Sequence, residues 1–192
     1  MKVLVACEFS GTVRDALLRN GHDAISCDLL PTTSPGPHVQ GDVTPLLSRS
    51  WDLVIAHPPC TYLANSGVRW LGTQPGRYEN MLAAAAFFRK CLDANAPKVA
   101  VENPIMHKYA KRAAQIGNPD CIIQPYQFGH PETKATCFWL RGLPPLYPTL
   151  AVEGRVPRVH HEPPHPDRWK RRSITYTGIA DAIAEQWGEC SW

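Results

Sequence analysis

The chain has 192 residues, a net charge of +3 and 44% hydrophobic residues. This ordinary size and composition predict one globular domain, residues 1–192. The longest apolar run is too short to cross a membrane, residues 1–6 start a strand rather than a signal peptide, and the net charge alone does not indicate nucleic-acid binding. The seven cysteines contain no C-x-x-C pair, which favours a cytoplasmic protein without a disulfide framework.

Short apolar runs and helical spacings alternate along the chain. We expect strands at 2–6, 24–27, 53–56, 98–101, 121–124 and 135–140, and a strand or turn at 39–42. We expect helices at 12–19, 78–91, 106–115 and 179–187. Residues 141–172 are proline-rich and basic, and we expect them to be irregular. The alternation predicts an α/β fold with a mostly parallel sheet and helices on both faces.

Cys60 follows two prolines at the end of the buried strand 53–56. Proline has no N–H to give to a ladder, so the strand must end there and Cys60 sits on a stiff turn. Ligands bind at the carboxyl edge of an open α/β sheet, and a rigid thiol there is placed like a nucleophile. A lone cysteine in an apolar segment also commonly serves only in packing, so both interpretations stay open.

Glu102 and Asn103 lie at the exit of the next expected strand, 98–101. Because consecutive parallel strands are usually neighbours, Glu102 is expected near Cys60. A carboxyl group in a cleft can donate a proton, so the two residues suit attack on an electron-poor ring whose nitrogen is protonated. The alternative for Glu102 is an acid that stabilises the start of a helix.

Asp28 and Asp42 follow the second and third expected strands. A carboxylate at such a position can accept hydrogen bonds from both ribose hydroxyls of a nucleotide. The alternative is a helix cap or a loop acid. The turn at Gly11 lacks the G-x-G-x-x-G pattern, so a dinucleotide is not favoured.

A basic stretch with one aromatic residue lies in the proline-rich segment. Phosphate contact and base stacking suit such a mixture, and the alternative is a solvated loop. The candidate nucleic-acid-binding residues are Arg168, Trp169, Lys170, Arg171 and Arg172. The histidines at 160, 161 and 165 lack a nearby cysteine pair, so we predict no metal site.

Taken in order, these residues resemble the cytosine-C5 DNA methyltransferases. Pro58-Pro59-Cys60 resemble the Pro-Cys nucleophile loop of that family, and Glu102-Asn103 resemble its Glu-Asn-Val motif, with Pro104 in the third place. The whole chain is similar to small phage and prophage proteins of this type, above all in HPPCTYLANSGVRW (57–70) and GIADAIAEQWG (178–188). The resemblance implies a Rossmann-like methyltransferase fold.

The resemblance also implies S-adenosyl-L-methionine as the cofactor. The residues that match the cofactor motifs of the family are Phe9, Ser10, Gly11, Asp28, Leu29, Asp42, Pro58, Thr177 and Gly178. The family has two further glycines after its Phe-x-Gly turn, and Val13-Arg14 stand at those positions here.

The mechanism implied by the resemblance uses four residues. Cys60 would add to C6 of cytosine, Glu102 would act at N3, and Asn103 would brace the Cys60 loop. Lys134 is the one positive charge kept from a Gln-x-Arg-x-Arg pattern that Glu132–Thr136 replace. In duplex DNA the target base would have to be flipped out of the helix.

Residues 141–176 stand in place of the family's target-recognition domain and are too few for one. A protein partner could supply recognition, or the substrate could be a free cytosine nucleotide instead of DNA. Methylation of an amino group of adenine or cytosine is a second enzymatic alternative, and a non-catalytic nucleic-acid-binding module is a third. The oligomeric state stays open, since Trp187 and Trp192 could pack internally or at an interface.

Overall fold

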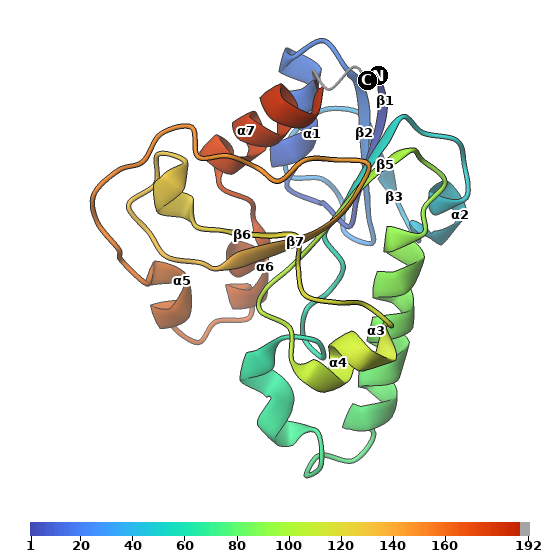
Figure 1. Cartoon of the computed structure of the whole chain (residues 1–192), viewed down its shortest axis with the longest axis vertical. Coiled ribbons are helices and arrows are strands. Elements are labelled where there is room, and N and C mark those ends of the chain that lie inside the picture. The colour runs from blue at the N-terminus through green and yellow to red at the C-terminus, as the bar shows by residue number, and fades with distance from the viewer. Residues whose placement is uncertain (189–192) are drawn as a thin grey trace.

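A seven-stranded sheet crosses the molecule in the computed structural model, which describes residues 1–188 (Figure 1). The strands lie in the order β3-β2-β1-β4-β5-β7-β6. Their bounds are β1 (Lys2–Ala6), β2 (Asp23–Asp28), β3 (His38–Gln40), β4 (Leu53–Ala56), β5 (Lys98–Asn103), β6 (Cys121–Ile123) and β7 (Thr136–Arg141). Cys190 and Trp192, which the sequence analysis considered, lie outside the described residues.

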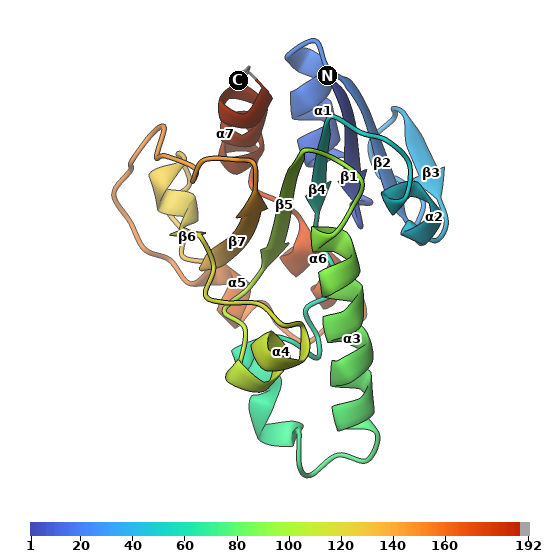
Figure 2. The same cartoon turned by 45° about the vertical axis from the view of Figure 1, so that its right-hand side comes forward.

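Four helices flank the sheet and cover both of its faces, as the sequence predicted. They are α1 (Thr12–Arg19), α3 (Arg77–Leu92), α4 (Lys108–Ala113) and α7 (Thr177–Gly188). Helices α1 and α7 pack on one face, whereas α3 and α4 pack on the other, and each face has its own hydrophobic core (Figure 2). No helix within residues 1–188 is long and apolar enough to cross a membrane.

Strand directions confirm the predicted mostly parallel sheet. Neighbours pair in parallel from β3 through β5, and β7 runs antiparallel to both β5 and β6. In the ladder, Ala56 lies opposite Ala6 on one side and Val101 on the other. Because the three strands are in register, they run to the same edge of the sheet. There Cys7 follows β1, His57 follows β4, and Glu102 and Asn103 are the last residues of β5, which is two residues longer than predicted.

The segment 141–172 corrects one expectation, because it is not wholly irregular. It forms two short helices, α5 (Arg158–His161) and α6 (Arg168–Ser173). Helices this short carry no apolar periodicity, so the sequence gives no signal for them. Ion pairs from α5 to Glu132 and from α6 to Glu162 hold them in place. Three further short elements, α2 (Thr44–Leu47), η1 (Asn65–Trp70) and η2 (Pro125–Gln127), were missed for the same reason.

Helix α7 packs closely against β7 and the segment that follows it. The fully buried Trp187 ring meets Phe138 edge-on, and its Nε1 donates to the Pro144 carbonyl oxygen at 2.9 Å. Trp187 therefore packs internally, which settles one of the two alternatives for this residue. At the other end of α7, a Cβ atom on Gly178 would lie 1.9 Å from the Phe128 carbonyl oxygen. Only glycine fits there.

The approach of Gly178 to Phe128 predicts that Gly178→Ala destabilises the protein by about 1–3 kcal/mol, because the α7 backbone must move away from Phe128. Gly72→Ala is the matched control, since no atom lies within 4 Å of a Cβ at Gly72, and we expect a change below about 0.5 kcal/mol. Urea unfolding of both variants measures the two free energies. Equal stability of the two variants would contradict the packing argument.

Candidate functional site

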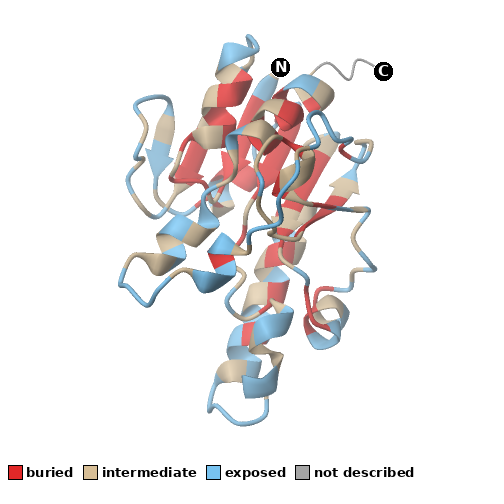
Figure 3. Ribbon diagram, turned by 90° about the vertical axis from the view of Figure 1, so that its left-hand side faces the viewer, coloured by how far each residue is buried: buried red, intermediate tan, exposed pale blue. Residues whose placement is uncertain are grey.

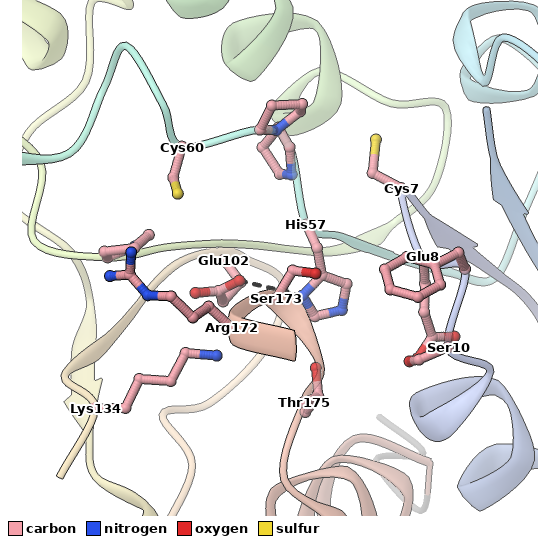
Figure 4. Close-up of a pocket in the computed structure, with 14 residues that line it drawn as sticks. Cys7, Glu8, Ser10, His57, Cys60, Glu102, Lys134, Arg172, Ser173 and Thr175 are labelled. Carbon is pink, nitrogen blue, oxygen red and sulfur yellow. Dashed lines mark hydrogen bonds and ion pairs between the residues drawn. The ribbon is translucent and has the colours of Figure 1, made fainter. Parts of the chain in front are cut away.

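A cavity of about 110 Å³ lies at the carboxyl edge of the sheet (Figure 4). Its walls come from the turns after β1, β4 and β5, from the segment before β7, and from α6 and the residues that follow it. Cys60, Glu102 and Lys134, three of the four predicted catalytic residues, all line this cavity. The chain thus brings together three side chains that are up to 74 residues apart in the sequence.

The fourth predicted catalytic residue, Asn103, contacts the backbone of the Cys60 loop. Its side chain is fully buried, and its Nδ2 donates to the Pro58 carbonyl oxygen at 3.1 Å. The carbonyl oxygen of Cys60 then accepts from the N–H groups of Leu63 and Ala64 at 3.0 and 2.9 Å. These bonds fix the backbone on both sides of the thiol, in addition to the two prolines.

Glu102 has a partner that the sequence analysis missed. His57 Nδ1 lies 3.3 Å from Glu102 Oε2, and the side chains are only 10% and 18% exposed. His57 Nε2 is buried and has no hydrogen-bond partner among the described residues. Figure 4 shows the His57 ring between Glu102 and the turn that carries Glu8 and Ser10. The sequence did offer a signal for His57, because this histidine stands directly before Pro58-Pro59 at the end of a strand.

Charges around Cys60 act on its thiol in opposite directions. Burial raises the pKa of Cys60, the Glu102 carboxylate raises it further, and the Lys134 and Arg172 cations lower it. Burial also lowers the pKa of Lys134, whereas the negative charges of Glu102 and Cys60 each raise it by a smaller amount. Lys134 Nζ donates to the Ile174 carbonyl oxygen at 3.4 Å, so the segment after α6 helps to hold it in the cavity.

The five predicted nucleic-acid-binding residues divide between two environments. Arg172 points into the cavity, where its Nε is buried without a partner among the described residues. Trp169 is 56% exposed, whereas Arg168 is half-buried and its Nε donates to the Glu162 carbonyl oxygen at 2.6 Å. Lys170 lies 3.0 Å from Asp167, and Arg171 forms an ion pair with Glu162. Acidic neighbours therefore already neutralise part of this surface.

The turn after β1 carries the first group of predicted cofactor residues. Phe9 and Ser10 line the cavity together with Pro58. Gly11 has φ +76°, and a Cβ there would lie 2.4 Å from Arg14 Nη2. Arg14 is fully buried, pairs with Asp15 at 2.7 Å, and packs against Gly11 and Gly36.

Glu8 was also missed by the sequence analysis. Its buried carboxylate accepts from the N–H of Val13 at 2.7 Å and from the N–H of Arg14 at 3.3 Å, so it caps the first turn of α1. The N-terminus of α1 is therefore not open to an anion. A carboxylate that lines the cavity can instead attract a cationic group such as an amine.

The acids after β2 and β3 lie beyond the cavity, at the same edge of the sheet. Asp28 Oδ1 accepts from the Leu30 N–H at 2.9 Å, and the adjacent Leu29 is 74% exposed. Asp42 is exposed and accepts from the Thr44 N–H at 2.9 Å, which caps the start of α2. An acid beside an exposed apolar side chain fits a nucleoside, with its ribose on the carboxylate and its base on the leucine.

Thr177 and Gly178 begin α7. His130 Nε2 accepts from the Gly178 N–H at 3.1 Å. Thr177 lines a second, open groove of about 260 Å³ with Ser10 and Thr12. Ser10 thus borders both the groove and the cavity. Among residues 1–188, no group of three His, Cys, Asp or Glu side chains could hold a metal ion.

No family model matches this sequence, and no curated protein matches it. Solved structures do match. A protein described as a DNA modification methyltransferase encoded within a prophage (E. coli) matches with TM-score 0.50 and 15% identity, over 84% of this chain and 55% of its own. The Entamoeba histolytica methyltransferase EhMeth matches with TM-score 0.47 and 16% identity, over 85% and 60%. The S. pombe Dnmt2 methyltransferase matches with TM-score 0.43 and 14% identity, over 83% and 53%.

The chain thus spans a little over half the length of the first of these proteins. The likeness to it, together with the strand order, shows that this chain has the Rossmann-like fold of S-adenosylmethionine-dependent methyltransferases.

The charges around Cys60 predict opposite effects of two substitutions on its alkylation. Glu102→Gln removes a charge that raises the pKa of Cys60, so more thiolate is present and iodoacetamide should react at least about threefold faster at pH 8. Lys134→Met removes a charge that lowers this pKa, so the reaction should slow by a similar factor. Peptide mass spectrometry at Cys60 gives both rates.

Cys91 is the internal control for this experiment. Burial raises its pKa to about 12, and neither Glu102 nor Lys134 contributes to that shift. Its rate should not change in either variant. A change of the same sign at Cys60 in both variants would indicate altered access to the thiol rather than altered charge.

Proposed function

We propose that this protein methylates cytosine at C5, in DNA, with S-adenosyl-L-methionine as the methyl donor. The observation that carries the proposal is the meeting of Cys60, Glu102 and Lys134 in one cavity beside the turn after β1. A thiol, a carboxyl group and a cation at one small cavity suit covalent activation of a pyrimidine ring. The cavity lies at the edge where the fold places its ligands.

The cofactor would lie along the same edge. Asp28 and Leu29 would hold its nucleoside, and the turn of Phe9 and Ser10 with Glu8 would hold its amino acid part. When bound, S-adenosylmethionine supplies an electrophilic methyl group next to the cavity. The Arg14 packing replaces the glycine-rich loop of the family as the support of this turn.

The chemical steps follow from the residues in the cavity. The Cys60 thiolate forms a bond to C6 of cytosine, which Lys134 favours by stabilising the thiolate. Glu102 hydrogen-bonds or protonates N3, so the ring accepts the electron pair and C5 becomes nucleophilic. After C5 is methylated, a base removes its proton, the C6–sulfur bond breaks and the ring double bond forms again. Asn103 keeps the thiol in place through Pro58.

His57 would act through Glu102. Its Nδ1 faces one carboxylate oxygen of Glu102 at 3.3 Å, which leaves the other oxygen for N3 of the base. An N–H at this position holds the rotamer of the carboxyl group and balances its charge. His57 is therefore a positioning residue in this proposal.

Transfer of labelled methyl groups tests the reaction. We expect 5-methylcytosine, identified by mass spectrometry, and a loss of at least about 10³-fold in Cys60→Ala and about 10²-fold in Glu102→Gln. Cys60→Ser with full activity would contradict the covalent route and favour amino-group methylation. The assay offers four substrates in parallel, which are duplex DNA, single-stranded DNA, RNA and cytosine nucleotides. Methylation of the free nucleotide alone would show that the nucleotide, and not DNA, is the substrate.

Calorimetry separates an inactive enzyme from a protein that does not bind the cofactor. Heat with S-adenosylhomocysteine at micromolar affinity is the expected result. A folded protein without such heat and without methyl transfer would support the non-catalytic nucleic-acid-binding module.

The His57 proposal predicts different effects of two substitutions of similar size. His57→Leu fills the space without a donor, so kcat should fall about 10²-fold with little change in KM. His57→Asn places an amide N–H near the position of Nδ1 and should retain kcat within about tenfold of the wild type. Equal losses in the two variants would show that the ring acts only in packing.

A further inference from the structure

A basic lobe projects from the fold beside the cavity. We define it as residues 61–78 and 104–116, which include η1, the start of α3 and the whole of α4. It forms the lower end of the molecule in Figures 1 and 2, and Figure 3 shows that most of its surface is exposed. The predicted nucleic-acid-binding residues of α6 lie outside this lobe.

The two segments of the lobe are tied together by backbone contacts. Asn65 N–H donates to the Ile105 carbonyl oxygen at 2.8 Å, and His107 N–H donates to that of Leu63 at 3.1 Å. The buried His107 ring also joins the two segments. Its Nδ1 accepts from the Ala110 N–H, so its Nε2 carries the proton and donates to the Tyr62 carbonyl oxygen at 3.1 Å. The lobe is therefore one unit rather than two independent loops.

The charge of the lobe has one sign. Its sequence contains no aspartate or glutamate and five cations, which are Arg69, Arg77, Lys108, Lys111 and Arg112. None of the five pairs with a carboxylate among residues 1–188. On α6, by contrast, Glu162 and Asp167 pair with two of the cations. Unpaired cations on one projecting surface suit a polyanion.

Aromatic rings lie among these cations. Trp70 is 40% exposed, Tyr109 is 48% exposed and Tyr78 is 51% exposed. Arg69 Cζ lies 4.7 Å from the centre of the Trp70 ring, and Lys108 Nζ lies 5.2 Å from that of Tyr109. Exposed rings beside cations are the combination that binds single strands, in which bases stack on rings and phosphates meet the charges.

The lobe begins at the residue that follows Cys60. Arg77 Nη2 donates to the Thr61 carbonyl oxygen at 3.1 Å, and its guanidinium lies 5.2 Å from the centre of the Tyr62 ring. A strand bound to the lobe would thus run past the opening of the cavity that holds Cys60. We infer that the basic lobe binds the single-stranded polynucleotide that carries the target base, an inference that rests on the proposed function.

Fluorescence anisotropy with a labelled single-stranded oligodeoxynucleotide that contains one cytosine tests the inference. The assay uses the full chain with Cys60→Ala and no cofactor, so binding is measured apart from methyl transfer. Trp70→Ala with Tyr109→Ala should weaken binding at least about fivefold through lost stacking. Arg69→Gln with Lys108→Gln should weaken it and reduce the slope of log K against log salt by about 1.4.

The matched control removes two surface cations that lie outside the lobe, as Arg19→Gln with Arg89→Gln. Both are already paired with acids, Asp181 and Asp93, so affinity should change less than about twofold. A larger loss in this variant than in the lobe variants, or wild-type affinity in both lobe variants, would overturn the inference. Tighter binding of a duplex than of the single strand would also overturn it. An RNA of the same sequence, run in parallel, shows which sugar the lobe prefers.

The outcomes separate this inference from the proposed function. If the wild type methylates DNA and the lobe variants bind with wild-type affinity, the proposed function is supported and the strand binds at a surface other than the lobe. Loss of binding in the lobe variants, with no methylation by the wild type, would support the lobe and refute the enzyme.

Discussion

The hydrogen bond from the Asn103 amide to the Pro58 carbonyl oxygen connects the two strand exits on which the site depends. Glu102 directly precedes this amide, and Cys60 follows the carbonyl by two residues, so one bond fixes the distance between acid and thiol. Both groups are buried, and an unpaired buried carbonyl costs about 1–3 kcal/mol. The bond is possible only because β4 and β5 pair in register and leave the sheet at the same edge.

This constraint explains the charge balance of the cavity. Because the acid and the thiol are held close to each other, the Glu102 carboxylate repels the thiolate and raises the pKa of Cys60. Lys134 and Arg172 come from the other side of the cavity and offset that repulsion. His57 faces Glu102 from its own strand exit. The Cys60 thiol and the Glu102 carboxyl group therefore share one small cavity, and cationic or donor groups approach each of them from separate elements.

The sheet and its main helices could be predicted from the sequence because each leaves a local pattern. Leu53–Ala56 is a short apolar run that two prolines end, and the structure gives this strand the predicted bounds. The placement of Glu102 near the Cys60 loop followed from the rule that consecutive parallel strands are neighbours. The orientation of Arg172 could not be predicted, because α6 is too short for a periodic pattern and depends on its ion pair with Glu162.

The roles of His57, Glu8 and Arg14 could not be predicted from the sequence. A histidine beside prolines, an acid in a turn and an arginine in a helix each have several ordinary roles, and only tertiary contacts choose among them. Arg14 lies directly against Gly11, so a buried side chain supports this turn.

The proline-rich basic segment contributes residues to the cavity that Cys60 and Glu102 line. Arg172 and Ser173 line it, and the backbone after α6 holds Lys134. The surface with exposed rings and with cations that pair with no carboxylate among residues 1–188 lies in the basic lobe, which begins directly after Cys60. If the lobe binds the polynucleotide as inferred, one segment covers the cavity and another binds the strand, and Cys60 lies directly before the segment that binds.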